Sequence, residues 1–320
     1  MLVFGPVPSR RLGRSLGINN IPAKTCSYSC IYCQLGANTS LSIHRQHFYD
    51  PETIVTQVKD RVERCRTLRE PIDFLTFVPD GEPTLDVNLG KEIKYLDSLG
   101  SKIAVLTNGS LVSKNDVMED LANADLVSLK IDTVKENTWR KMNRPHRDLG
   151  LSVVLDGMRG FAEAYQGELI TETMLIDGVN DGVNEIRDIA KFLKELQPKK
   201  AYIAIPTRPP AEEWARAASE ESINRGYQIV RDALGPERVE HLIGYEGDAF
   251  ASTGDFEDDL LSITSVHPMR EDAVSRLVRK ASVDWLAVER LIKQDQLIKI
   301  EYGGCNFYMR RLASNPASEP

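Results

Sequence analysis

Residues 25–34 read Thr-Cys-Ser-Tyr-Ser-Cys-Ile-Tyr-Cys-Gln, which places three cysteines within eight positions in a C-x3-C-x2-C pattern. Three thiolates this close together in the chain can surround one metal centre. A structural zinc site usually takes four protein ligands, and no fourth cysteine or histidine follows at zinc-finger spacing. Around a four-iron cluster, Cys26, Cys30 and Cys33 would leave one iron open to bind another molecule. A zinc site and three buried structural cysteines are the alternative interpretations.

Composition and charge place the chain among ordinary globular proteins. Its 320 residues, 42% of them apolar and 27% charged, suffice for one large domain and a small one. No apolar run approaches a membrane span, and the proline-containing N-terminus lacks the apolar core of a signal peptide, so we expect a cytoplasmic protein. The five cysteines are too unevenly spread for a disulfide framework. The net charge of −7 excludes a basic coat that binds nucleic acid broadly.

Short β-rich runs alternate with amphipathic helical patterns between about residues 16 and 245. The expected strands span residues 16–21, 72–78, 102–106, 126–131, 169–176, 201–205 and 239–244. The expected helices span residues 51–69, 88–99, 114–123, 150–164, 183–196 and 220–234. Strands that alternate with helices form parallel βαβ units, and this many units favour a curled, barrel-like sheet. Ligands bind at the C-terminal ends of the strands in such sheets, so the chemical motifs should follow strands.

The pattern changes after about residue 254. Three short helices are expected there, over residues 255–264, 270–281 and 283–294. They precede a hairpin around a Gly-Gly turn, over residues 297–302 and 306–311. Three helices and then a hairpin is the order of a winged helix. We therefore expect an α/β protein with a partial (β/α)6 barrel and N-terminal extension over residues 1–250, a winged-helix-like domain over 254–314, and a frayed tail at 315–320.

The cysteine pattern, with the aromatic Tyr32 directly before its last cysteine, resembles the signature of the radical SAM superfamily. The resemblance covers residues 15–245 and implies the barrel of that family. It also implies that Cys26, Cys30 and Cys33 bind a 4Fe–4S cluster whose open iron is chelated by S-adenosylmethionine. Reductive cleavage of that cofactor then yields a 5′-deoxyadenosyl radical, which abstracts hydrogen from a substrate. By the same resemblance, Tyr32 packs beside the adenine.

A second motif follows the expected strand 72–78. It reads Pro-Asp-Gly-Glu-Pro-Thr and resembles the Gly-Gly-Glu element of the family, with Asp80 in place of the first glycine. The resemblance implies that Gly81, Glu82 and Pro83 contribute to a site for the methionine ammonium group of the cofactor. Alone, Gly-Glu-Pro is a common turn, so its place after a strand carries the interpretation.

Polar residues also follow or end the next strands. Asn108 stands in a Thr-Asn-Gly run, which reads either as a turn or as part of the cofactor pocket. Alternation places Ser128, Lys130 and Asp132 on one face of a strand, where polar groups pointing into a barrel need partners. The resemblance implies that ribose hydroxyls and the methionine carboxylate are those partners, and a buried salt bridge is the alternative. Glu172, on the following strand, completes the expected cofactor contacts.

Residues 5–17 read Gly-Pro-Val-Pro-Ser-Arg-Arg-Leu-Gly-Arg-Ser-Leu-Gly and resemble a radical SAM subgroup described as wyosine-synthase-related. True wyosine synthases modify a tRNA base and carry extra cysteines for a second cluster. Here Cys65 lies on the apolar face of an expected helix and Cys305 in a hairpin turn, so neither can build such a cluster. We therefore do not expect wyosine synthesis itself.

Basic residues near the expected site predict the charge of the substrate. Arg10, Arg11, Arg144 and Arg208 are the expected substrate contacts, and they indicate a substrate that carries phosphate or carboxylate. A solvated run of charges is the alternative interpretation. The pattern does not distinguish a small molecule from an RNA or a peptide. By the resemblance, the electron donor is a flavodoxin or ferredoxin and the enzyme is oxygen-sensitive.

The C-terminal module leaves three hypotheses open. It is acidic overall, so we expect it to contact protein, present substrate or act as a lid rather than bind DNA tightly. A rival hypothesis is a redox-sensing regulator, in which the cluster detects oxidation and the winged helix reads DNA, although a sensor does not need the cofactor motifs. A third is an activating enzyme that acts on a partner protein, although the usual ferredoxin-like cysteine insert is missing.

Overall fold

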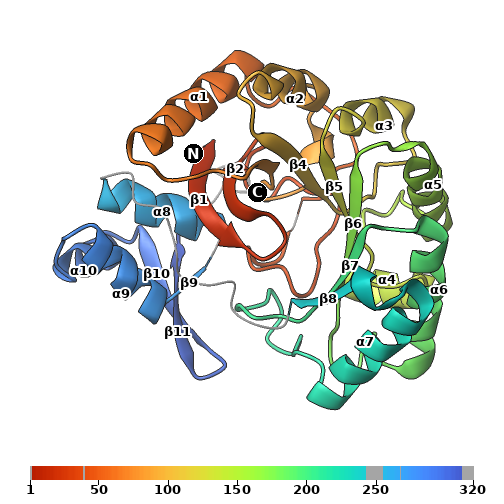
Figure 1. Cartoon of the computed structure of the whole chain (residues 1–320). Coiled ribbons are helices and arrows are strands. Elements are labelled where there is room, and N and C mark those ends of the chain that lie inside the picture. Colours follow the sequence, from red (N-terminus) through yellow and green to blue (C-terminus); the bar gives the residue numbers. More distant parts are fainter. Residues whose placement is uncertain (1, 39, 243–254, 267, 312–320) are drawn as a thin grey trace, which may run out of the picture.

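The computed structural model describes residues 2–38, 40–242, 255–266 and 268–311. Eight strands of this part form one curled sheet in sequence order from β1 to β8 (Figure 1). β1 (Val3–Ser9) runs antiparallel to β2 (Gly13–Ile18), and the later neighbours are parallel. The remaining strands are β3 (Phe74–Phe77), β4 (Lys102–Thr107), β5 (Leu126–Lys130), β6 (Glu168–Met174), β7 (Lys200–Ala204) and β8 (Val239–Leu242).

Helices cover the outer face of the curled sheet (Figure 1). In α1 (Pro51–Thr67) the side chain of Asp50 accepts a hydrogen bond from the backbone N of Glu52, and Pro51 has no N–H to leave unpaired, so the chain starts a helix there. The others are α2 (Leu89–Asp97), α3 (Asn115–Leu121), α4 (Glu136–Met142), α5 (Leu151–Ala164), α6 (Val183–Leu196) and α7 (Glu220–Leu234), with single turns η1 (Pro83–Leu85) and η2 (Pro236–Arg238).

The expected barrel strands and helices are all present, and two further elements were missed. The first is β1, whose Pro6 and Pro8 read as an irregular extension. An edge strand tolerates proline because its outward positions need no N–H, and β1 is such an edge. The second is the short helix α4. In addition, β2 begins at Gly13 and ends at Ile18, three residues earlier than expected at each end.

Three expectations lie outside the described residues. They are the end of the last barrel strand at 243–244, the boundary between the two domains at 250–254, and the frayed tail at 315–320. The division into domains therefore stays a prediction at those positions.

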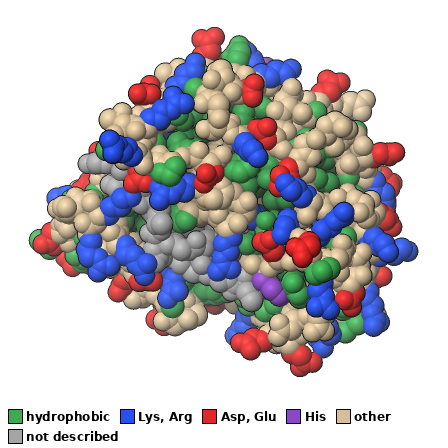
Figure 2. All heavy atoms as spheres, viewed as in Figure 1, with side chains coloured by type: hydrophobic (Ala, Val, Ile, Leu, Met, Phe, Trp, Pro, Cys, Tyr) green, Lys and Arg blue, Asp and Glu red, His purple; other side chains and the backbone are tan. Residues whose placement is uncertain are grey.

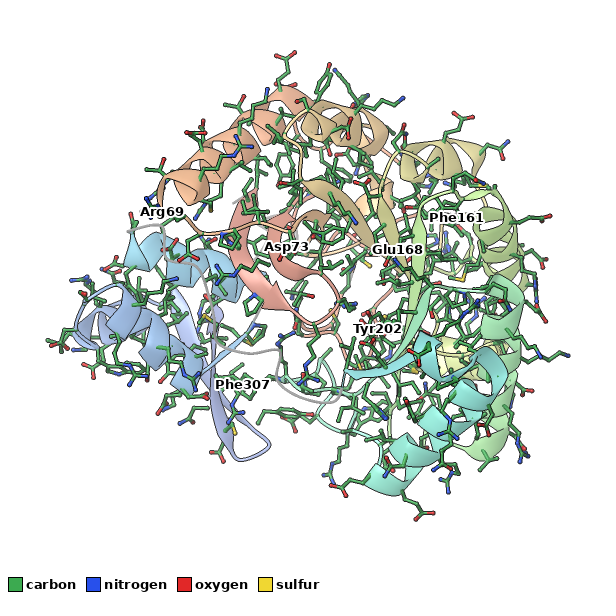
Figure 3. The ribbon with its side chains drawn as sticks, viewed as in Figure 1. Arg69, Asp73, Phe161, Glu168, Tyr202 and Phe307 are labelled. Atoms are coloured by element: carbon green, nitrogen blue, oxygen red, sulfur yellow. The ribbon has the colours of Figure 1, made fainter. Side chains whose placement is uncertain are left out.

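The two faces of the sheet pack into different cores. Val127 packs outward with Phe161 of α5, whereas its neighbour Leu126 packs inside the curl with Ile170 and Tyr202, as strand alternation requires. Figure 3 shows Tyr202 within the curl and Phe161 among the outer helices. Polar side chains replace the inner apolar layer toward the C-terminal ends of the strands, which is where a ligand site is expected in this architecture.

A smaller unit follows the barrel and confirms the winged-helix-like expectation. Its three strands form an antiparallel sheet in the order β10-β11-β9, and a helix precedes β9 while two more precede the hairpin. The elements are α8 (Phe256–Val266), β9 (Met269–Arg270), α9 (Glu271–Lys280), α10 (Leu286–Lys293), β10 (Leu297–Tyr302) and β11 (Cys305–Arg310).

The winged-helix-like module packs against the first strand of the barrel sheet (Figure 1). Phe4 and Val7 of β1 share one buried cluster with Phe256 and Leu260 of α8. The edge of the barrel sheet is thereby covered, which protects a strand that would otherwise offer unpaired backbone groups to other chains.

The surface and the helices agree with the composition. On the face seen in Figure 2, Lys and Arg side chains are interspersed with Asp and Glu rather than gathered into one broad basic surface. None of the helices within the described ranges is long and apolar enough to cross a membrane.

Candidate active site

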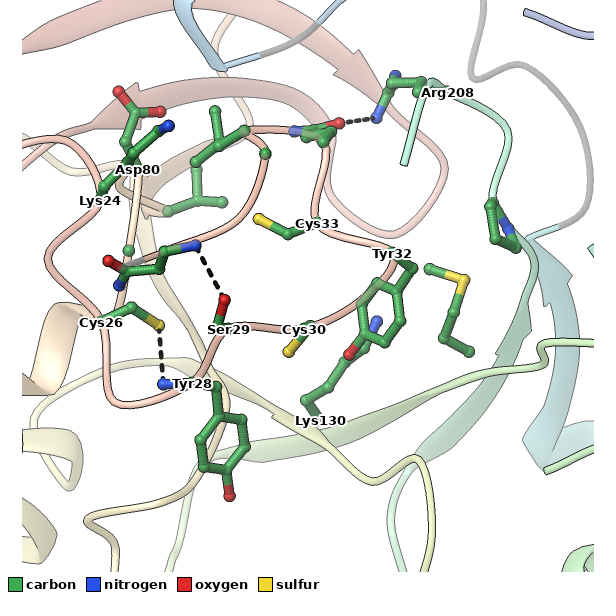
Figure 4. A pocket seen from close by; sticks show the side chains of 18 of the residues that line it. Lys24, Cys26, Tyr28, Ser29, Cys30, Tyr32, Cys33, Asp80, Lys130 and Arg208 are labelled. Carbon is green, nitrogen blue, oxygen red and sulfur yellow. Dashed lines mark hydrogen bonds between the residues drawn. The ribbon is translucent and has the colours of Figure 1, made fainter. Parts of the chain in front are cut away.

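The cysteine loop follows β2 and lies at the C-terminal ends of the strands. One cavity of about 360 Å³ is lined by Cys26, Cys30 and Cys33 (Figure 4). The backbone N of Ile31, between the second and third cysteines, donates to the carbonyl O of Met142 at 2.9 Å. Its own carbonyl O accepts from the backbone N of Glu212, also at 2.9 Å. The loop is thus held between the end of α4 and the segment that follows β7.

The Gly-Glu motif after β3 holds the start of the same loop. The backbone N of Glu82 donates to the carbonyl O of Thr25 at 3.0 Å. A Cβ atom on Gly81 would lie 1.9 Å from that carbonyl oxygen, so a side chain at this position forces the two segments apart. The glycine of the motif is therefore required for the contact beside Cys26.

Nitrogen donors point at the sulfur atoms of Cys26 and Cys30. Asn143 Nδ2 lies 3.5 Å from Cys30 Sγ. Asn108 Nδ2 and the backbone N of Tyr28 lie 3.7 Å and 3.5 Å from Cys26 Sγ. Hydrogen bonds of this kind stabilise negative charge on sulfur and tune iron–sulfur centres.

The side chains of the three cysteines are only partly exposed, and this burial opposes ionisation of their thiols. It raises the pKa of Cys30 to about 12, with Asp132 adding to the shift, and it also raises the pKa of Cys26 and of Cys33. Thiolates at these positions need a cation beside them, and a metal centre supplies one. The site therefore favours three neutral thiols or three metal-bound thiolates.

Tyr32 belongs to a buried polar network behind the cavity. Its hydroxyl donates to Asp132 Oδ2, which also accepts from Asn143 Nδ2 at 2.8 Å. The second oxygen of Asp132 accepts from the backbone N of Met174 at 2.9 Å. Lys130 Nζ lies 4.9 Å from the centre of the Tyr32 ring. These contacts fix the ring at the cavity wall, and Figure 4 shows it close to Lys130.

Glu172 lies between two cations on the inner face of the sheet. One carboxylate oxygen accepts from Lys130 Nζ and the other from Arg11 Nη1. Burial raises the pKa of Glu172, but the charges of Arg11 and Lys130 outweigh it and the result is about 2. Burial likewise lowers the pKa of Lys130, while Glu172 and Asp132 raise it overall. All members of this group are therefore charged at neutral pH.

Glu82 is fully buried and anchored by its neighbours. Its Oε1 accepts from the backbone N of Thr84 at 3.1 Å and from the hydroxyls of Thr84 and Thr107, each at 2.6 Å. Its Oε2 accepts from the backbone N of Asn108 at 2.8 Å. Burial raises the pKa of Glu82, although these donors favour the carboxylate. Oε2 therefore retains more accepting capacity than Oε1.

Most of the predicted site residues come together here. Those that line the main cavity or an adjoining cavity of about 240 Å³ are Cys26, Cys30, Cys33, Tyr32, Gly81, Glu82, Asn108, Ser128, Lys130, Glu172, Arg11 and Arg208. Asp132 stands behind Tyr32, and Pro83 begins η1. Arg10 and Arg144 line neither cavity, and Arg144 pairs with Glu212 instead.

Asn143 is one residue of this site that the sequence interpretation missed. It directly follows α4, a helix that the sequence interpretation also missed. A signal was present, since Trp139 and Met142 stand three positions apart as on the buried face of a helix, and both are buried. What the pattern could not show is that the next side chain meets Cys30.

Comparison with known proteins identifies the family. The model of the radical SAM superfamily matches residues 20–193. UPF0026 protein MJ1312 of Methanocaldococcus jannaschii is 45% identical over 313 residues, 98% of this chain and 97% of that protein. A structure of TYW1 with a lysine-pyruvate adduct bound is similar with a TM-score of 0.53 and 15% identity, covering 68% of this chain and 73% of that chain. Streptococcus suis SuiB bound to S-adenosylmethionine has a TM-score of 0.52 and 13% identity, covering 70% and 49%.

The two similar structures show the fold. Membership of the family rests on the match to the family model and on the 45% identity to UPF0026 protein MJ1312. The match spans more than half of the chain and includes both the cysteine pattern and the Gly-Glu motif. Radical SAM enzymes use a 4Fe–4S cluster and S-adenosylmethionine and take electrons from an external donor. The resemblance to the radical SAM superfamily is thus confirmed, and this chain belongs to that superfamily, as an enzyme with those two cofactors.

Proposed function

We propose that Cys26, Cys30 and Cys33 hold the 4Fe–4S cluster and that S-adenosylmethionine binds in the cavity beside them. The supporting observation is that the three thiols share one cavity with Tyr32 and Lys130.

The other site residues fit a cofactor that is part nucleoside and part amino acid. A 4Fe–4S cluster held by Cys26, Cys30 and Cys33 would supply the electron that breaks the sulfonium C–S bond of S-adenosylmethionine, and the 5′-deoxyadenosyl radical released with methionine would abstract a hydrogen atom from the substrate. Tyr32, fixed by Asp132, presents a flat ring for the adenine. Ser128 and Asn108 offer hydrogen bonds from the adjoining cavity.

The methionine end of the cofactor carries an ammonium and a carboxylate. Glu82 Oε2, with one donor so far, can accept from the ammonium, and Pro83 sets the turn that holds this motif. Lys130 provides a buried cation for the carboxylate, shared with Glu172.

The charges around the main cavity favour an anionic substrate. Among the described residues that line it, four are cationic and two are anionic: Arg11, Lys24, Lys130 and Arg208 against Asp80 and Glu172. An excess of positive charge in a partly buried space favours a ligand that carries negative charge. Arg11 and Arg208 are the substrate contacts we favour over Arg10 and Arg144, which line neither cavity. A flavodoxin or ferredoxin is the proposed electron donor.

Anaerobic reconstitution with iron and sulfide, followed by dithionite reduction with S-adenosylmethionine, tests the proposal. Chromatography should detect 5′-deoxyadenosine from the unsubstituted protein and none above background from Cys30→Ala. Cys305→Ala is the matched control, because Cys305 lies in β11 of the other module, and it should retain the product. Product from Cys30→Ala, or its loss from both variants alike, would contradict the assignment of the cluster ligands.

A further inference from the structure

A side pocket adjoins the main cavity next to Arg11 and Arg208. It has a volume of about 120 Å³ and shares Arg11, Gln34, Val78 and Arg208 with the main cavity. These shared residues stand where the two spaces meet. A molecule held at the boundary can therefore extend into both spaces.

The walls of the side pocket are mainly apolar. They include Phe4, Val7, Leu12 and Leu106, from the hairpin of β1 and β2 and from β4. Deeper polar groups are already satisfied, since the Ser15 hydroxyl pairs with the Thr76 hydroxyl at 2.7 Å. Away from its boundary with the main cavity, the pocket therefore offers a ligand mostly apolar surface.

Neighbouring contacts keep the pocket in shape. A Cβ atom on Gly17 would lie 2.0 Å from the ring of Phe4, so the ring packs directly on the β2 backbone. On its other side Phe4 belongs to the buried cluster that contains Phe256 and Leu260 of the winged-helix-like module. Phe4 is therefore held between β2 and the winged-helix-like module. The module thus helps to shape the side pocket.

The boundary of the side pocket is cationic. Arg11 reaches it from the turn between β1 and β2, and Arg208 reaches it from the segment after β7, where its Nη1 donates to Gln34 Oε1 at 3.2 Å. Both guanidinium groups can form paired hydrogen bonds to the oxygens of a carboxylate or phosphate. The side pocket thus has a cationic rim above mainly apolar walls.

We propose that the substrate is an amphipathic anion. Its carboxylate or phosphate binds Arg11 and Arg208, its short apolar part fills the side pocket, and its reacting carbon faces the cysteine side of the cavity. Given about 30 Å³ for a water-sized group, the pocket holds roughly four methylene groups. This inference rests on the proposed function for its reaction, but its binding step can be measured separately.

The experiment measures binding to the reconstituted holoenzyme with S-adenosylmethionine and without reductant. The probes are straight-chain carboxylates from acetate to octanoate, alkyl phosphates of the same lengths, and the matching alcohols and amines, all followed by calorimetry. Affinity of the anions should rise about fourfold per methylene until roughly four are buried, then level off. Alcohols and amines should bind at least tenfold more weakly than anions of equal length. Preference for one anion series over the other identifies the head group.

Variants separate the two halves of the site. Arg208→Gln should weaken the binding of all anions about equally. Arg147→Gln, which replaces a side chain that is 90% exposed, should not weaken it. Leu106→Phe should stop the increase of anion affinity at a shorter chain length, and Phe4→Leu should let it continue to a longer one. Circular dichroism checks that both variants fold.

Two results would overturn this inference. One is an affinity that does not depend on chain length in the unsubstituted protein, and the other is alcohols or amines that bind as well as anions. Either result can coexist with formation of 5′-deoxyadenosine. In that case the proposed function stands and the amphipathic substrate does not. Absence of that product in the presence of chain-length-dependent anion binding would instead refute the proposed function.

Discussion

Glu92 of α2 and Asp86, at the end of η1, form a carboxyl pair that solvent does not reach. Within the described part of the chain, no donor serves either oxygen of Glu92 or Oδ2 of Asp86. Two carboxylates only accept hydrogen bonds, so one proton must lie between them. Burial and the neighbouring charges of Asp86 and Asp120 raise the pKa of Glu92, which places the proton there. Burial also raises the pKa of Asp86, to about 6, although the backbone N–H of Asn88, Glu92 and the charges of His47 and Arg45 favour its charged form.

This pair predicts that stability falls as pH rises. Above its ordinary pKa, Glu92 has lost its proton in the unfolded chain but keeps it in the folded protein up to the raised pKa. Stability is therefore lost across that window, at about 1.4 kcal/mol per pH unit. Glu92→Gln keeps a hydrogen-bond donor to Asp86 but has no proton to lose. Its free energy of unfolding, measured in urea, should therefore rise relative to that of the unsubstituted protein as the pH increases from 5 to 9. The exposed Glu119→Gln is the control, and parallel pH profiles for all three proteins would refute the pair.

Asn143 should set the electronic environment of the proposed cluster. Its Nδ2 donates toward Cys30 Sγ at 3.5 Å, and loss of such a donor destabilises the more negative, reduced state. Asn143→Leu should therefore make the midpoint potential of the reconstituted protein more negative in a redox titration followed by electron paramagnetic resonance. Asn123→Leu, at an exposed position after α3, should leave the potential unchanged. An unchanged potential in Asn143→Leu would show that this contact has no electronic effect.

At the scale of elements, the turn after β3 packs its backbone directly against the backbone of the cysteine loop. Gly81→Ala places a methyl group 1.9 Å from the carbonyl oxygen of Thr25, so the two segments must separate. We expect a loss of roughly 1–3 kcal/mol of stability and less iron bound per chain after reconstitution. Gly160→Ala in α5, where a Cβ meets nothing within 4 Å, should keep its iron. Equal iron content in both variants would show that the contact does not organise the loop.

At the scale of the molecule, the barrel and the winged-helix-like module are joined through buried groups. Arg61 of α1 is buried and lies 3.2 Å from Asp258 and 3.3 Å from Asp259 of α8. The side chain of Asp259 is only 2% exposed. Together with the cluster around Phe4, these contacts make the module an integral part of the barrel edge rather than a freely attached one.

This junction predicts that breaking one buried pair destabilises the whole chain. Arg61→Leu removes the guanidinium that lies beside the buried side chain of Asp259, so it should cost about 3–5 kcal/mol in urea unfolding. Arg66→Leu on the same helix removes an exposed arginine whose pair with Glu63 spans 3.9 Å, and it should cost at most about 0.5 kcal/mol. Similar losses in the two variants would mean that the junction carries no special stability.

Much of the architecture could be predicted because its signals are local. The cysteine spacing, the Gly-Glu turn and the two hydrophobic periods each occupy a few consecutive residues, so they indicated the family, the βαβ order and the winged-helix-like order. β1 was missed because its prolines are acceptable only at an edge, and a sequence does not show which strand is the edge. α4 was missed because only two buried residues, Trp139 and Met142, mark its face.

The sequence alone therefore determined the cofactor class and the succession of elements, because bonding patterns and side-chain periods are properties of neighbouring residues. Only the tertiary structure decided which polar groups meet. Arg11 and Glu172 are 161 positions apart, and Asn143 and Cys30 are 113 apart. Likewise, two of four candidate arginines line the cavity, and the module covers β1. Such contacts depend on how the sheet curls and closes, which no local pattern encodes.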